Sequence, residues 1–173
     1  MRNRAALLGA ARNAFSTFGP DVPLETVARE AGVSRTTLRR HFDSREALIA
    51  ALVEDNVRAI EERATSLRGT SEAIVDLFHF ALTLQTSLPG TARIVSRADV
   101  PGFVELADRV AAAFRDCVDS ASPLHTDVAA EDLVMALPMA DAAVTEELAA
   151  GRSPDLERLH SMLHRALFTS TRR

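Results

Sequence analysis

A short segment rich in hydrogen-bond donors lies near the start of this 173-residue chain. Residues 34–41, SRTTLRRH, carry hydroxyl and guanidinium groups and an imidazole, and they include no acid. Such side chains donate hydrogen bonds to phosphate oxygens and to base edges in a DNA major groove. The segment therefore predicts a nucleic-acid-binding helix.

The residues around this segment predict two short helices joined by a tight turn. The first helix has an apolar face and runs into Gly32, a residue type that suits the left-handed end of a helix. Ser34 suits the N-cap of the second helix because its hydroxyl can accept a free backbone N–H. Leu38 is expected to point into the core. Two helices joined in this way form a helix-turn-helix.

The charge of the chain is divided unevenly, although the net charge is −4. Residues 1–45 hold eight arginines and four acids, whereas residues 46–173 hold twelve arginines and twenty acids. A basic N-terminal part on an acidic body concentrates the field that attracts phosphate at one end.

The whole chain predicts an all-α fold, because Ala, Leu, Arg and Glu dominate and strand-like alternation is absent. A long helix from Arg45 to about Leu67 would start in the basic part and end in the acidic part, and so connect the two. Pro23 is expected to open the second helix. We expect about nine helices, the others over residues 3–18, 34–41, 72–87, 91–98, 101–120, 129–150 and 154–169, in two domains, 1–45 and 46–173.

Several classes of function are disfavoured. Apolar runs are shorter than 18 residues, so we expect no transmembrane helix, and the N-terminal stretch fits an amphipathic helix better than a signal peptide. The single cysteine, Cys117, is compatible with a cytoplasmic protein. The sequence has no Gly-rich phosphate loop, nucleophile elbow or metal motif, so no enzyme activity, cofactor or metal is expected.

With these residues in view, about 55 N-terminal residues resemble the tetracycline-repressor (TetR) family of bacterial regulators. The similarity lies in the segment AGVSRTTLRRHFDSREAL, residues 31–48, which follows the family's AGVS-x-x-T-L-aromatic-x-H-F pattern. Arg39 departs from it, because the family usually has a tyrosine there that touches a phosphate. Pro23 is a smaller departure, since a Thr or Ser cap often stands at that position.

The resemblance implies a homodimer that binds a near-palindromic operator in double-stranded DNA and represses transcription. Half-sites of such dimers lie roughly 34–36 Å apart, or multiples of that distance. Base-edge or sugar contacts are expected from Arg35, Thr36 and Thr37. Phosphate contacts are expected from Ser34, Arg39, His41 and Arg45, with Thr26 as a weaker candidate.

The resemblance also implies a small, largely apolar effector between the helices of the body, which releases the repressor by moving the fourth helix. His79 and Arg93 are the best polar candidates for contacting it. The full set of candidates for the ligand site is Phe78, His79, Leu82, Arg93, Phe103, Leu106, Phe114, Cys117, Met135 and Met139.

Leucines at spacings of three and four on the last two helices predict a dimer interface built as a four-helix bundle. Pro138 falls inside the first of these helices and either kinks or splits it. The candidates for the interface are Leu133, Leu137, Val144, Leu156, Leu159, His160, Leu163 and Leu167.

An alternative reading keeps the DNA-binding part and makes the body a protein-interaction module without a small-molecule inducer. A body with no cavity of roughly 300 Å³ or more would favour this alternative.

Overall fold

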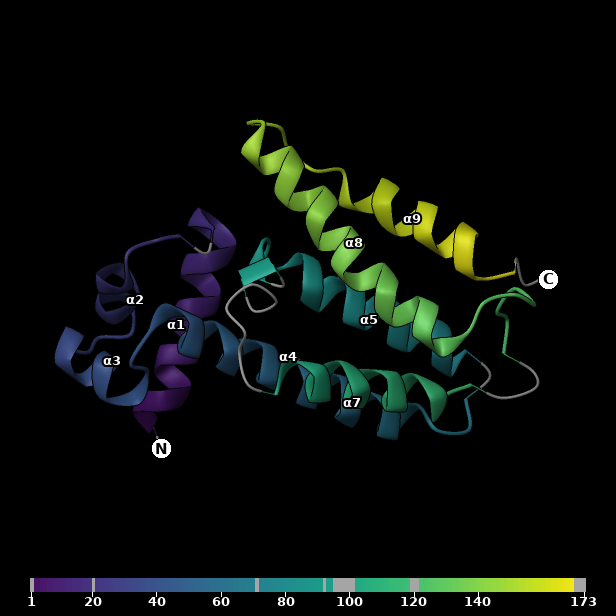
Figure 1. Ribbon diagram of the computed structural model, residues 1–173, viewed down its shortest axis with the longest axis horizontal. Helices are drawn as coiled ribbons and strands as arrows, with labels where there is room; N and C mark the ends of the chain where they lie inside the picture. Colours follow the sequence, from purple (N-terminus) through teal and green to yellow (C-terminus); the bar gives the residue numbers. More distant parts are fainter. Residues whose placement is uncertain are drawn as a thin grey trace.

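The computed structural model describes residues 2–19, 21–70, 72–91, 93–94, 102–118 and 122–169, with the side chains of all but Arg2, Asn3 and Phe103. Eight helices lie in these ranges, as the all-α prediction requires (Figure 1). Ser71, directly before the helix expected over residues 72–87, and most of the helix expected over residues 91–98 lie outside the described residues.

Three helices form a unit at the N-terminus, which we call the head (Figure 1). They are α1 (Arg2–Phe18), α2 (Leu24–Glu30) and α3 (Arg35–His41). Phe15, Val27 and Leu38, one from each helix, are completely buried in its core. A common apolar core of this kind fixes α3 relative to the other two helices.

A single long helix, α4 (Arg45–Leu67), joins the head to the rest of the chain. Ser44 caps it by accepting the N–H of Ala47 at 3.0 Å. Leu48, Ile49 and Leu52 of α4 belong to the core of the head, whereas Val57 and Ile60 belong to the second core. The core of the head therefore extends past residue 45, where the sequence suggested a domain boundary.

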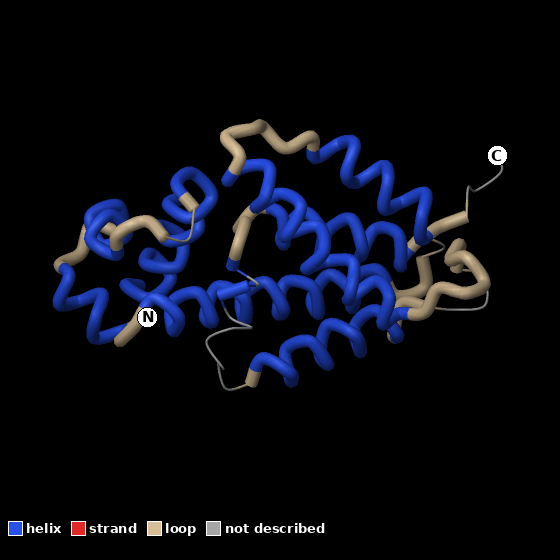
Figure 2. The backbone as a smooth tube through the Cα atoms, turned by 45° about the horizontal axis from the view of Figure 1, so that its top comes forward, coloured by secondary structure: helices blue, strands red, loops and turns tan. Residues whose placement is uncertain are grey.

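The remaining helices form what we call the body: α5 (Ala73–Thr86), α7 (Phe103–Arg115), α8 (Ala130–Ala149) and α9 (Leu156–Leu167). Helices α4, α5, α7 and α8 pack side by side, and α9 lies against the outer side of α5 and α8 (Figures 1 and 2). Phe78, Phe114 and Phe168 meet in the middle of this core.

An ion-pair cluster fastens α7 to α4. The guanidinium of Arg109 donates two hydrogen bonds of 2.8 Å to the carboxylate of Glu61 and one of 2.9 Å to Glu54 Oε2. Glu54 and Glu61 lie two turns apart on the same side of α4, so one arginine spans both. These contacts hold the pKa of Glu61 below its usual value.

Two features of the helix ends were not expected. The last residue of α1, Phe18, is 66% exposed, because the chain turns at Gly19 (φ +79°) directly after it. The helix expected over residues 101–120 ends at Arg115, where the N–H groups of Asp116 and Cys117 close a tight turn.

Pro138 lies inside α8 without splitting it, because the helix is continuous from Ala130 to Ala149. No helix in the described part of the chain is both long enough and apolar enough to span a membrane.

One carboxylate is buried in the body. Asp141 on α8 is 2% exposed and accepts the backbone N–H of Gly90 at 2.9 Å. This bond ties the turn after α5 to the middle of α8. Burial raises the pKa of Asp141 to about 6 from an ordinary 3.8, although the Gly90 N–H opposes the shift.

We predict that this carboxylate makes stability depend on pH. Between about pH 6 and pH 4 the folded chain binds a proton at Asp141 that the unfolded chain does not, so Asp141 stabilises the fold as the pH falls through that window. Asparagine cannot ionise at this position. The free energy of unfolding of Asp141→Asn should therefore rise relative to that of wild type, by up to roughly 3 kcal/mol, as the pH rises through this window. Urea unfolding of both proteins at either end of the window measures this. The same difference at both pH values would contradict the prediction.

Candidate nucleic-acid interface

Local sequence holds α3 at the surface of the head. Gly32 has a φ of +67°, which lets the chain turn sharply between α2 and α3. Ser34 caps α3, since its hydroxyl accepts the N–H of Thr37 at 3.1 Å. Leu38 anchors the helix in the core, and the C-cap Phe42 is also buried. One face of α3 is thereby fixed inward and the other is left to solvent.

The outward face of α3 carries the side chains that the sequence singled out. Ser34, Arg35, Thr36, Arg39 and His41 are exposed, and no acid occurs within α3. Thr37 is half-buried, and its hydroxyl lies 2.9 Å from that of Ser34. The structure thus brings these six predicted residues together on one short surface helix.

The remaining two predicted residues lie at the edge of this surface. Thr26 on α2 and Arg45 at the start of α4 are both half-buried. Arg45 Nη1 donates to the carbonyl of Val22 at 2.8 Å, so this guanidinium also holds the loop before α2.

Sequence reasoning missed one residue of this surface, Glu25. Its carboxylate pairs with Arg35 Nη1 at 2.8 Å, and both side chains are more than half exposed. An acid in the first turn of a helix is expected to interact with the helix dipole, so its position did not indicate a partner on α3. The guanidinium of Arg35 is therefore held by Glu25 through one of its nitrogens.

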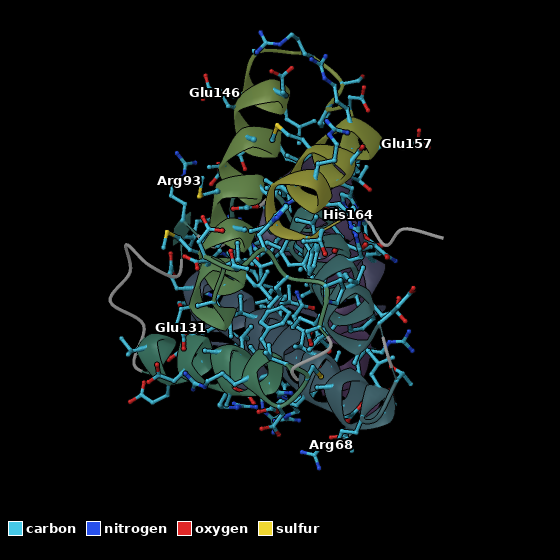
Figure 3. The ribbon with its side chains drawn as sticks, turned by 90° about the vertical axis from the view of Figure 1, so that its right-hand side faces the viewer. Arg68, Arg93, Glu131, Glu146, Glu157 and His164 are labelled. Carbon is cyan, nitrogen blue, oxygen red and sulfur yellow. The ribbon has the colours of Figure 1, made fainter. Side chains whose placement is uncertain are left out.

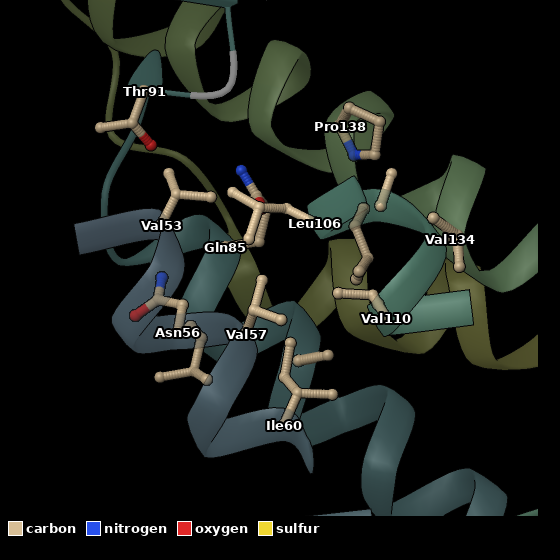
Figure 4. Close-up of a pocket in the computed structure, with 14 residues that line it drawn as sticks. Val53, Asn56, Val57, Ile60, Gln85, Thr91, Leu106, Val110, Val134 and Pro138 are labelled. Atoms are coloured by element: carbon tan, nitrogen blue, oxygen red, sulfur yellow. The ribbon is translucent and has the colours of Figure 1, made fainter. Parts of the chain in front are cut away.

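A cavity lies in the body between α4, α5, α7 and α8 (Figure 4). Its volume is about 130 Å³. Asn56, Gln85 and Thr91 supply its polar side chains, and none of the described residues that line it carries a charge. The lining consists of Val53, Asn56, Val57, Ile60, Ala81, Leu84, Gln85, Thr91, Leu106, Ala107, Val110, Val134, Leu137 and Pro138.

Of the ten residues predicted for a ligand site, Leu106 lines this cavity. Phe78, Leu82, Phe114 and Cys117 are buried in the core of the body instead. Burial also raises the pKa of the Cys117 thiol, whose Sγ lies 3.8 Å from the carbonyl oxygen of Ala64. The sequence missed the four lining residues of α4, since candidates were sought from the fifth helix onward.

The other predicted ligand residues lie apart from the cavity. Met135 and Met139 are 58% and 63% exposed, because they occupy the outer face of α8. Arg93 is exposed at the outer surface (Figure 3), and the side chain of Phe103 lies outside the described part.

His79 is part of a cluster of imidazoles between α5 and α9. Its Nε2 lies 3.1 Å from Nδ1 of His164, and its ring stacks on that of His160 with centroids 5.8 Å apart. Burial lowers the pKa of His79, and the two neighbouring imidazoles lower it further. These rings therefore join α9 to α5.

The predicted dimer residues divide into two groups. Leu133, Leu137, Val144 and Leu167 are buried inside the subunit's own core, so they offer no surface to a partner. Leu156 is exposed, and the half-buried residues are Leu159, His160 and Leu163. The leucine spacing on α8 therefore reflects packing against the rest of the body rather than a dimer interface.

Comparison with known proteins agrees with this arrangement. Residues 7–52 match the family model described as "Bacterial regulatory proteins, tetR family". An uncharacterized HTH-type transcriptional regulator of Mycobacterium tuberculosis is 36% identical over 90 residues, which are 51% of this chain and 42% of that protein. RutR, an HTH-type transcriptional regulator of Escherichia coli, is 29% identical over 129 residues, 70% of this chain and 59% of RutR. The matched segment thus spans less than half of the mycobacterial relative.

The similarity of the fold extends over the whole chain. The crystal structure of a TetR transcriptional regulator from Streptomyces coelicolor superposes with a TM-score of 0.63 and 27% sequence identity. The match covers 97% of this chain and 99% of that one. Together with the helix-turn-helix and the helical body, these matches show that the chain belongs to the TetR family of bacterial regulatory proteins.

Proposed function

We propose that this protein binds operator DNA as a homodimer in the bacterial cytoplasm and regulates transcription. The observation that carries the proposal is the outward face of α3, which presents arginines, hydroxyls and an imidazole and is anchored from behind by Leu38. A helix held in this way can enter a major groove without rearranging its own core. The names of the two sequence relatives, both HTH-type transcriptional regulators, support the same function.

The DNA contacts follow from the position of each side chain. Arg35, Thr36 and Thr37 at the N-terminal end of α3 would read base edges. Ser34, Arg39, His41 and Arg45 would contact phosphates, with Thr26 at the margin. A contact between Arg35 and DNA would compete with its ion pair to Glu25. Losing this pair would cost little free energy, because exposed ion pairs contribute only about 0–1 kcal/mol.

The outer faces of α8 and α9 would form the dimer interface. Met135 and Met139 are one turn apart on α8, and Leu156 and Met162 are exposed on α9. Large apolar side chains that gather on neighbouring helices and face solvent mark an interaction surface. The partner would bury these side chains rather than the inward leucines of α8.

The cavity is the proposed effector site, and its size restricts the effector. About 130 Å³ is close to an engineered apolar cavity of about 150 Å³ that binds benzene, and below the range of about 300–1,000 Å³ of drug-sized sites. A ring-sized, uncharged effector that releases the protein from DNA fits these dimensions.

The same volume favours a second candidate function. Because the cavity is smaller than roughly 300 Å³, the body could act as a protein-interaction module without an inducer. Release of the operator complex by a ring-sized compound would support the effector. The protein-interaction module would be supported if no such compound released the operator complex and a protein partner bound the body.

We predict that Arg35→Ala and Thr37→Ala each weaken specific DNA binding by about 1 kcal/mol or more, roughly fivefold, because each removes a base contact. Fluorescence anisotropy measures this on a DNA site selected in vitro with the wild-type protein. Arg58→Ala is the control, since Arg58 is an exposed arginine of α4 paired with Glu54. If neither α3 variant binds more weakly than the control, α3 does not read DNA.

We predict that the double variant Met135→Glu/Met139→Glu dissociates into monomers, with a dimer Kd raised by roughly 30-fold or more, because two buried apolar contacts would be replaced by charges. Analytical ultracentrifugation measures the Kd. Val104→Glu is the matched control, since Val104 on α7 is exposed but lies on neither α8 nor α9. Equal dimer affinity in all three proteins would contradict the proposed interface.

A further inference from the structure

Asn56 belongs to the cavity and to the contact between α4 and the head at the same time. Its side chain lines the cavity, and its Oδ1 accepts a hydrogen bond of 2.8 Å from Nη1 of Arg12. Arg12 lies on α1, the first helix of the head. In the view of Figure 4, the oxygen of Asn56 points away from Gln85 and Leu106. One amide therefore separates the interior of the cavity from a guanidinium of the DNA-binding head.

The other two polar groups of the cavity are bonded within the body. Gln85 interacts with the carboxylate of Asp141 on α8, whose pKa it lowers, and Thr91 Oγ1 donates to the carbonyl of Leu88 at 2.7 Å. An occupant that engaged Gln85 or Thr91 would act on contacts among the body helices. An occupant that engaged Asn56 would act on a contact made by the head.

Arg12 has a second partner that makes an exchange possible. Its Nη2 lies 3.5 Å from Oδ2 of Asp55, whose side chain is half exposed. If Arg12 lost the oxygen of Asn56, its charge would keep Asp55 and solvent as partners. The exchange would therefore leave no buried, unpaired charge, which is the outcome that would make it costly.

We propose that Asn56 is the residue through which an occupant of the cavity acts on the head. An uncharged, ring-sized molecule with a hydrogen-bond donor, such as a primary amide, turns the Asn56 amide so that its oxygen faces the cavity. The occupant thereby takes this oxygen from Arg12 and removes the polar contact between α1 and α4. The molecule should be uncharged because the lining carries no charge, and ring-sized because the cavity has a volume of about 130 Å³. It should carry a donor because the Asn56 oxygen that Arg12 now uses is an acceptor. This inference rests on the proposed function, in which the cavity holds the effector and the head binds DNA.

The exchange makes binding of the occupant and binding of DNA mutually unfavourable. If the Arg12–Asn56 bond holds α1 in the DNA-binding arrangement, an occupant that breaks it lowers the affinity for DNA. DNA must then lower the affinity for the occupant by the same factor, because the two equilibria are linked.

The first arm of the test is a double-mutant cycle on DNA affinity in the full-length protein, with the DNA site selected in vitro. Arg12→Leu and Asn56→Leu should each weaken binding five- to tenfold, and the double variant should bind no more weakly than the weaker single variant. Asn56→Asp keeps the acceptor for Arg12 and should stay within about twofold of wild type. Arg58→Leu, an exposed change on the same helix, is the control.

The second arm uses benzamide as the probe and isopropylbenzene as an apolar compound of similar size. Arg12→Leu should bind benzamide at least fivefold more tightly than wild type, because the Asn56 oxygen is then available, and Asn56→Leu should bind it more weakly. Benzamide should release wild-type protein from DNA, and isopropylbenzene should not. Ligand-observed NMR measures binding, and anisotropy measures release.

Additive losses in the double-mutant cycle would overturn the inference. So would equal affinity of benzamide for wild type and Arg12→Leu, or no binding of benzamide to either protein. Failure of the proposed function is recognised separately, because the wild-type protein would then select no DNA site or would bind it independently of Arg35.

Discussion

One continuous helix, α4, is built into two apolar cores and so fixes the position of the head relative to the body. Leu88, in the turn after α5, is also buried in the core of the head. The first two turns of α4 bury Leu48 and Leu52 with the head, and its later turns bury Val57 and Ile60 with the body. A packed helix does not bend freely between two such anchors, because each core is close-packed and resists small displacements. The position of α3 relative to the body is therefore set through a segment that both cores hold.

Much of this architecture could be predicted from sequence, because its signals are local. Gly32, Ser34 and Leu38 fix the turn, the cap and the anchor of α3 within seven residues, and each lies where its chemistry requires. The bounds of α4 were also correct, since Ser44 begins the helix and Gly69 follows its end. The cluster of side chains along α3 followed directly, because residues on one short helix are neighbours in sequence as well as in space.

The cavity and the outer face of α8 could not be predicted in the same way, because they depend on how distant helices meet. Leucine spacing shows that Leu133 and Leu137 share a face, but it does not show whether that face meets the same subunit or a second one. Met135 and Met139 were predicted for the ligand site, because helical spacing likewise does not show which face of α8 meets solvent. Asn56 is one amide on a largely apolar face, and its contact with Arg12 joins residues 44 positions apart.

Pro138 weakens one turn of α8, although the helix is continuous. Proline has no backbone N–H, so the carbonyl of Val134, four residues earlier, lacks the helical donor that its neighbours have. Val134 and Pro138 both line the cavity. The turn of α8 that forms this wall is therefore held by one hydrogen bond fewer than the turns beside it, and widening the cavity there would cost less than opening a regular interior turn of the helix.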